Sequence, residues 1–199
     1  MSTWQPLLDW WFGAEGSATE VAAARQGLWF GKRDGQDLEA EARFGALVER
    51  ALAGDLKDWL DDPQAWLAQL ILLDQLPRMI FRNTPRAFAG DSRARPLLQE
   101  GLERGWDRRL TPIQRVFAYL VFEHAEDLPL QDRAVELFAD LLNEAAVDER
   151  PLFADFLDFA ERHQRVIVRF GRFPHRNAIL GRASTDEEQA FLREPGSRF

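Results

Sequence analysis

Apolar residues recur along this chain every three to four positions, which is the spacing of a helix with one buried side. The period is clearest between Leu38 and Leu52 and between Phe156 and Ile167. No window alternates apolar and polar residues as a half-buried strand would. The most strand-like stretch, VIVRF at 166–170, continues the stripe that begins at Phe156. The pattern therefore predicts an all-α fold.

Capping signals divide the chain into helices joined by short loops. Asp62 with Pro63 and Thr111 with Pro112 place a capping side chain before a proline in the first helical turn. Ser184 to Glu187 has the spacing of a capping box, and Pro77 is expected to kink or end its helix. We expect helices over 3–12, 37–53, 62–77, 91–106, 111 to the Pro129 region, 130–145, 151–170 and 184–192.

No stretch rich in glycine, serine or proline separates one part of the chain from another. We therefore expect residues 1–199 to form a single domain of antiparallel helical hairpins. Residues 1–36 are expected to hold a short helix and an irregular segment, with one helical turn near 25–30. Residues 194–199 are expected to be a frayed tail.

Composition excludes several classes of function. The 199 residues include no cysteine, so disulfides, thiolate metal sites and cysteine nucleophiles are absent. No apolar run is long enough to span a bilayer, and the first residues lack the basic start of a secretory signal. We expect a cytoplasmic protein with no membrane partner. A net charge of −8 and a pI of about 5.0 also argue against a nucleic-acid partner.

The basic residues are biased in kind and in position. Arginine supplies 23 of the 25, and the two basic stretches, 76–115 and 162–199, alternate with the acidic stretches 1–75 and 116–161. Genome composition explains much of the arginine excess, and the stretches could simply neutralise each other across packed helices. Alternatively, some guanidinium groups hold carboxylates or phosphates through paired hydrogen bonds, which lysine cannot form.

Three segments carry more polar chemistry than packing requires. In the first, 73–86, Asp74 and Arg78 are four residues apart and could pair on a helix, while Arg78, Arg82 and Arg86 recur at the same spacing. In the second, 121–127, His124 continues an apolar stripe and should point inward at a helix end, where Glu123 or Asp127 could orient it. The plainer interpretations are an ion-paired helix end and a satisfied core histidine.

The third segment is 161–177. His163 lies on an apolar stripe, and Gly171 and Pro174 predict a turn after the long helix. Several basic side chains converge around this turn. Arginines often neutralise the unpaired carbonyl groups at a helix end, but this explains only some of the basic residues here. The ten candidate ligand-binding residues of the three segments are Asp74, Arg78, Arg82, Glu123, His124, His163, Arg169, Arg172, His175 and Arg176.

The same segments carry a resemblance to a known family. LILLDQLPRMIFRNTPRAFAGD, FAYLVFEHAEDLPLQDRAVELF and RHQRVIVRFGRFPHRNAILGRASTDEEQAFL resemble the bacterial family known as domain of unknown function 924, and LLDWWFG near the start matches it more weakly. The resemblance implies an all-helical fold grouped with tetratricopeptide-like right-handed superhelices. It implies no activity, cofactor or catalytic residue.

Three functions are compatible with these patterns. The first is binding of a small anionic ligand in a polar pocket lined by arginine and histidine, with loops 82–90 and 171–177 at its rim. The second is a metal-assisted hydrolase using His124, His163 and His175, although no pair has a recognised metal-binding spacing and nearby arginines would repel a cation. The third is a tetratricopeptide-like scaffold that binds a protein or peptide. The sequence identifies neither a reaction nor an oligomeric state.

Overall fold

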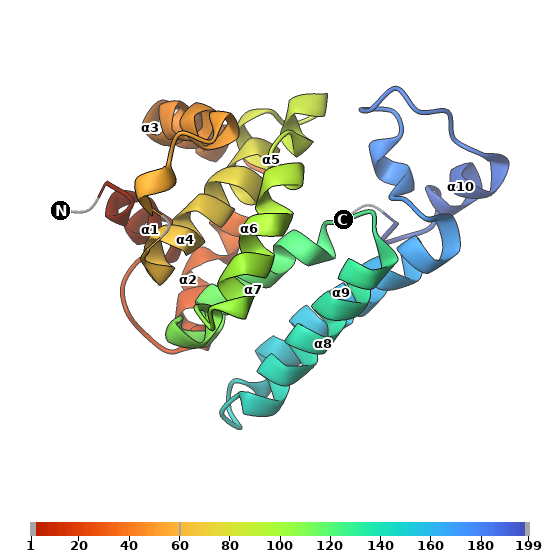
Figure 1. Ribbon diagram of the computed structural model, residues 1–199. Coiled ribbons are helices and arrows are strands. Elements are labelled where there is room, and N and C mark those ends of the chain that lie inside the picture. Colours follow the sequence, from red (N-terminus) through yellow and green to blue (C-terminus); the bar gives the residue numbers. More distant parts are fainter. Residues whose placement is uncertain (1–2, 60, 198–199) are drawn as a thin grey trace.

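The computed structural model describes residues 3–59 and 61–197, and every regular element in these ranges is helical (Figure 1). This confirms the predicted all-α class. Short 3-10 turns occur at Lys57–Trp59, Pro85–Phe88, Asp107–Arg109 and Pro174–Arg176. The α-helices are α1 (Gln5–Phe12), α2 (Ala18–Trp29), α3 (Asp34–Ala53), α4 (Pro63–Leu70), α5 (Leu76–Ile80), α6 (Asp91–Glu103), α7 (Pro112–Glu123), α8 (Leu128–Glu144), α9 (Arg150–Phe170) and α10 (Asp186–Phe191).

Local capping chemistry sets most of the helix starts. The Asp62 carboxylate accepts hydrogen bonds from the backbone of Gln64 and Ala65 at the start of α4. A capping box of Thr111 and Gln114 begins α7. These two starts are where the sequence predicts them. At α10 the cap is Thr185 with Glu188, one residue later than predicted.

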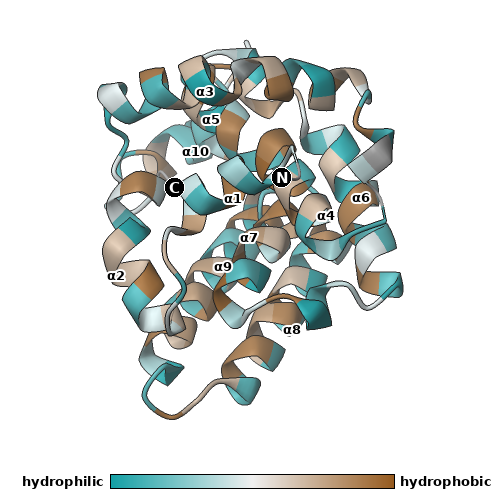
Figure 2. Ribbon diagram, turned by 90° about the vertical axis from the view of Figure 1, so that its left-hand side faces the viewer, coloured by the Kyte–Doolittle hydropathy of each residue, from teal (hydrophilic) through white to brown (hydrophobic). Residues whose placement is uncertain are grey.

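Helix α7 lies at the centre of the fold and is buried along its length. The ring of Phe117 packs edge-on against Trp11, Phe12 and Trp29, at centroid distances of 5.4, 5.5 and 4.6 Å. These contacts hold α1 and α2 against α7. In Figure 2, hydrophobic and hydrophilic residues alternate along the outer helices α2 and α3, as expected of helices with one buried side.

Helices α8 and α9 run antiparallel beside this core as a long hairpin (Figure 1). The end of α9 forms a second, smaller apolar cluster in which Val166, Ile167 and Phe173 are buried and Phe170 and Phe191 pack against them. This smaller cluster joins α9 to the segment that leads to α10. The predicted hairpin architecture is thus present, whereas the right-handed superhelix remains a prediction.

Two expectations near the ends of the chain are wrong. Residues 18–29 form the helix α2 instead of one turn, because Ser17 and Glu20 make a capping box that the sequence analysis missed. Residues 194–197 are not frayed: Ser197 is buried, and the Gly196 backbone packs against Arg162. The remaining tail residues, 198 and 199, lie outside the described residues.

Pro77 neither ends nor sharply breaks its helix. Helices α4 and α5 are joined without interruption through a π-helical turn, Ile71–Gln75. The proline stands in the first turn after it, where a missing backbone N–H is tolerated. No helix in the described part of the chain is long and apolar enough to cross a membrane.

Candidate functional site

A buried polar cluster forms where the π-helical turn, the end of α7, the middle of α9 and the turn Pro174–Arg176 meet. Its ionisable side chains come from segments up to about a hundred positions apart in the sequence. Such a concentration of charge is costly to bury, and for that reason it often marks a functional site. The buried polar cluster consists of Asp74, Arg78, Asp91, Glu123, His124, His163, His175 and Arg176.

The π-helical turn and Gly90 together place the acidic side of the cluster. A Cβ atom on Gly90 would lie 2.0 Å from the carbonyl oxygen of Leu73, so only glycine allows the start of α6 to approach the turn this closely. Asp91, the next residue, therefore reaches Arg78 and makes two hydrogen bonds of 2.9 and 3.2 Å with it. π-helical turns are common at functional sites, and this one carries Asp74.

Asp74 is the most constrained carboxylate of the cluster. It is 1% exposed, and both of its oxygens lie within 2.9 Å of Nδ1 of His124. Arg78 lies 3.2 Å from it, which confirms the pairing predicted from their spacing, and the Gln75 amide donates a further hydrogen bond. Burial alone would raise the pKa of Asp74, but Arg78 and His124 outweigh it and hold the pKa below its usual value. Asp74 is therefore ionised.

An ionised Asp74 determines the tautomer of His124. Burial lowers the pKa of His124 more than Asp74 raises it, so the ring is neutral near pH 7. Because a carboxylate only accepts hydrogen bonds, we assign the proton to Nδ1, which leaves Nε2 with a lone pair. The predicted orienting partners, Glu123 and Asp127, are wrong for this residue. Asp127 instead caps α8 through the backbone N–H of Leu130.

Glu123 forms a second carboxyl–imidazole pair with His163. Nδ1 of His163 lies 3.0 Å from the Glu123 carboxyl and 2.8 Å from the carbonyl oxygen of Phe159. Burial, reinforced by the charge of Asp74, raises the pKa of Glu123 to about 8. Burial also lowers the pKa of His163. At neutral pH the pair is therefore a protonated carboxyl beside a neutral ring, and not an ion pair.

Arg176 is a buried cation with incomplete compensation. Its guanidinium lies between the rings of Phe88 and Phe173, at 4.8 and 4.4 Å, and donates to the carbonyl oxygen of His124. Its nearest carboxylate contact is 3.8 Å, to Asp91, and its Nε makes no hydrogen bond within the described residues. Burial and the neighbouring Arg78 lower the pKa of Arg176 to about 10.

His175 and Arg176 are held in place by a carboxylate that the sequence analysis did not select. Glu126 accepts two hydrogen bonds, of 2.6 and 2.9 Å, from Arg182 and a third from the backbone N–H of Phe173. These bonds fasten the turn after α9 to the end of α7. Burial, Arg176 and His124 lower the pKa of His175 to about 3, so this ring is also neutral. The only sequence signal for Glu126 is its position two residues after His124, in the stretch EHAE at 123–126.

Three predicted ligand-binding residues lie outside the buried polar cluster because each has a carboxylate elsewhere. Arg82 binds Asp37 of α3 through two hydrogen bonds of 2.7 Å. Arg172 binds Glu188 at 2.6 and 2.8 Å. Arg169 binds Glu187 at 2.9 Å. Arg169 and Arg172 therefore connect the end of α9 to α10, whereas His175 and Arg176 belong to the buried polar cluster. The basic side chains that were predicted to converge around Gly171 thus lie in two separate places.

The metal arrangement considered for His124, His163 and His175 is not found. Among residues 3–59 and 61–197, no group of three or more histidine, aspartate or glutamate side chains is arranged to hold a metal ion. Nδ1 of His124 already faces Asp74, and Nδ1 of His163 faces Glu123 and a backbone carbonyl. Arg78 and Arg176 also add positive charge beside the rings.

Comparison with known proteins agrees with this architecture. A family described as bacterial protein of unknown function (DUF924) matches residues 7–196. A solved structure of a protein of unknown function from Agrobacterium tumefaciens is 37% identical, with a TM-score of 0.74 over 88% of this chain and 96% of that chain. No curated protein matches.

Proposed function

Because the chain belongs to the bacterial DUF924 family, whose function is unknown, we propose a function from its own buried polar cluster. We infer that the cluster binds a small anion, such as a carboxylate or a phosphate, beside Arg176 and His124. This is the ligand class expected from the arginine and histidine pattern of the sequence.

The observation that carries the proposal is the incomplete compensation of Arg176. A buried guanidinium normally has a carboxylate in hydrogen-bonding contact, because an unpaired buried charge is costly. Arg176 is 5% exposed, yet its closest carboxylate contact is 3.8 Å, and the charged group with the largest effect on its pKa is another cation, Arg78. An anion beside it would supply the direct hydrogen-bonding contact that Asp91 does not make, and an acceptor for its Nε.

The neutral imidazoles add a proton acceptor to this anion site. Within the cluster, the carboxylates of Asp74 and Asp91 balance the two guanidinium groups while Glu123 is protonated. An incoming anion would therefore favour uptake of a proton by His124 or His175, which raises the pKa of that ring. Binding should accordingly strengthen as the pH falls. His124 could also accept a proton from a bound molecule through Nε2, with Asp74 stabilising the charged ring.

Thermal unfolding in phosphate and in acetate, each compared with chloride at equal ionic strength, tests the proposal. We expect at least one of the two anions to raise the midpoint of the wild-type protein. The effect should disappear in Arg176→Gln and in the half-buried His175→Asn, and persist in Arg133→Gln, which removes an exposed arginine of α8. His175→Asn keeps the test decisive if Arg176→Gln does not fold.

The three histidines provide a second measurement. In a carbon–proton spectrum, their ring signals are few enough to assign with single substitutions. We expect the effective anion to shift the signals of His124 and His175 and to raise the pKa of at least one of them. An equal thermal response in wild type and His175→Asn, with unshifted histidine signals, would overturn the proposal.

A further inference from the structure

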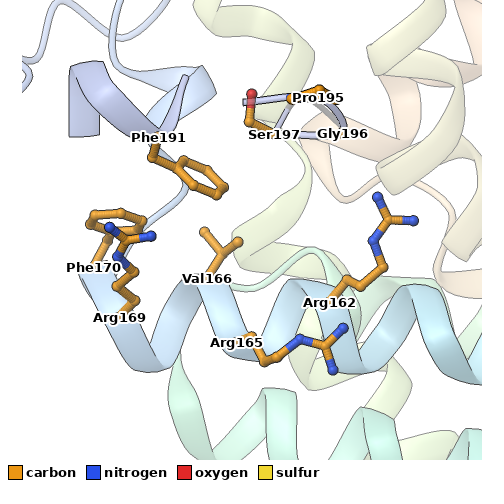
Figure 3. Close-up of a pocket in the computed structure, with 9 residues that line it drawn as sticks. All are labelled: Arg162, Arg165, Val166, Arg169, Phe170, Phe191, Pro195, Gly196 and Ser197. Atoms are coloured by element: carbon orange, nitrogen blue, oxygen red, sulfur yellow. The ribbon is translucent and has the colours of Figure 1, made fainter. Parts of the chain in front are cut away.

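A separate cavity of about 260 Å³ lies between α9, α10 and the turn at residues 195–197 (Figure 3). No residue of the buried polar cluster lines it. In Figure 3, Arg162 extends toward the turn, and the ring of Phe191 lies over Val166. The cavity thus has its own walls, and the anion site proposed above leaves it unexplained.

The cavity is cationic on one side. Arg162, Arg165 and Arg169 all line it from α9, and none of the nine described residues that line it is acidic. Two of these arginines pair with carboxylates only at the exposed surface. Glu161 lies 3.6 Å from Arg165, which is longer than a hydrogen bond, and the 2.9 Å hydrogen bond between Arg169 and Glu187 is half-exposed. Exposed ion pairs of this kind contribute little free energy, so an incoming anion can compete with them.

The other side of the cavity is apolar and aromatic. The rings of Phe170 and Phe191 lie 5.1 Å apart at an angle of 50°, and Val166 forms the floor between them. The guanidinium of Arg169 stands 4.7 Å from the Phe170 ring centre and 5.7 Å from that of Phe191. A cation at the edge of an aromatic wall matches a ligand that has both an acidic group and a ring.

We propose that this cavity is a second binding site, for an organic anion that carries one aromatic or similarly sized apolar group. The volume agrees with such a ligand, because an apolar cavity of about 150 Å³ already holds benzene and the remaining space suits a carboxylate or phosphate group. The ring packs against the wall formed by Phe191 and Val166, and the acidic group accepts hydrogen bonds from Arg165 and Arg169. Either half of the ligand alone binds more weakly.

Titration calorimetry with three probes tests this two-part recognition. Benzoate has both parts, benzyl alcohol has the ring without the charge, and acetate has the charge without the ring. We expect benzoate to bind about tenfold more tightly than either of the other two, as for a ligand with a charge-assisted hydrogen bond and a buried ring. Equal binding of the three probes, or no binding of benzoate, would overturn the site.

Two sets of variants locate the binding. The double variant Arg165→Gln/Arg169→Gln and the single variant Phe191→Leu should each weaken benzoate binding about tenfold or more. The matched control is Arg104→Gln/Arg133→Gln. It removes the same charge from two exposed arginines that also pair with carboxylates on their own helices. If the control loses as much benzoate affinity as Arg165→Gln/Arg169→Gln, the loss is caused by the change in net charge alone, and the site is refuted.

The outcome is independent of the function proposed for the buried polar cluster. His175→Asn should leave benzoate binding unchanged, because His175 does not line the cavity. If His175→Asn abolishes the benzoate response and Phe191→Leu does not, the response belongs to the buried polar cluster and the second site is wrong. If phosphate and acetate fail at the cluster while benzoate binds as expected, only the function proposed for the cluster is wrong.

Discussion

We expect the free energy of unfolding of the wild-type protein to fall between pH 7 and 8. Replacing Glu123 by glutamine should abolish this decrease. The folded-state pKa of Glu123 is raised to about 8 from an ordinary value of 4.5, because the carboxyl is buried beside ionised Asp74. The folded protein therefore binds a proton that the unfolded chain has already released. Stability falls as the pH rises through this window, which is opposite to the usual effect of a carboxylate.

The size of the effect follows from the proton difference. A full proton corresponds to about 1.4 kcal/mol per pH unit. Because Glu123 is itself half-titrated near pH 8, the loss of unfolding free energy between pH 7 and 8 is about 1 kcal/mol. The buried histidines offset part of it. Their folded-state pKa values are lowered, so the unfolded chain binds more protons on them than the folded protein does. With an unfolded-state pKa of about 6.5, the three together add about 0.4 kcal/mol between pH 7 and 8, which leaves a net loss of about 0.6 kcal/mol.

Urea unfolding at pH 7.0, 7.5 and 8.0 measures this slope. We expect a decrease for the wild-type protein and a slight increase in the free energy of unfolding for Glu123→Gln, in which only the histidines contribute. Glu136→Gln, on the exposed side of α8, should keep the wild-type slope. If wild type and Glu123→Gln show the same slope, Glu123 is ionised in the folded protein and the reasoning is refuted.

Three further predictions concern the support of the buried polar cluster. Gly90→Ala should lower the unfolding free energy by about 1–3 kcal/mol, because its Cβ would meet the Leu73 carbonyl. In the interior of α3, Gly45→Ala should instead raise it by about 0.5–1 kcal/mol, because its Cβ would make only an ordinary contact with Glu41; chemical denaturation compares the two. Asp74→Asn should cost about 3–5 kcal/mol in the same assay, because it removes the buried negative charge that faces Arg78 and the Nδ1 proton of His124. A cost below 1 kcal/mol would contradict the assigned charges. Arg172→Ala should lower the thermal midpoint without changing the response to phosphate or acetate; a lost anion response would return Arg172 to the ligand site.

Residues that act within one helix were predictable from spacing. Asp74 and Arg78 are four positions apart and do pair, although through a π-helical turn that the pattern did not reveal. His124 and His163 lie on apolar stripes and do point inward. Helical periodicity determines which side of a helix faces the core, so such positions follow from the sequence alone.

Partners between helices were not predictable in the same way. Asp91 looks like a helix start in the sequence, but the close approach at Gly90 makes it a partner of Arg78. Arg172 looks like part of a basic cluster, yet Glu188 binds it sixteen positions later. The sequence contains more carboxylates than arginines, and only the packing of the helices decides which of them meet.

The amino-acid sequence by itself determined the helical class, most helix starts and the inward direction of the central histidines. These properties depend on local capping and on the period of one helix. The tertiary structure alone decided that Asp74 meets His124, that Glu123 meets His163, and that Arg169 belongs to an aromatic cavity outside the buried polar cluster. The physical reason is that charge pairing and burial act over a few ångströms in space, between residues that are far apart along the chain.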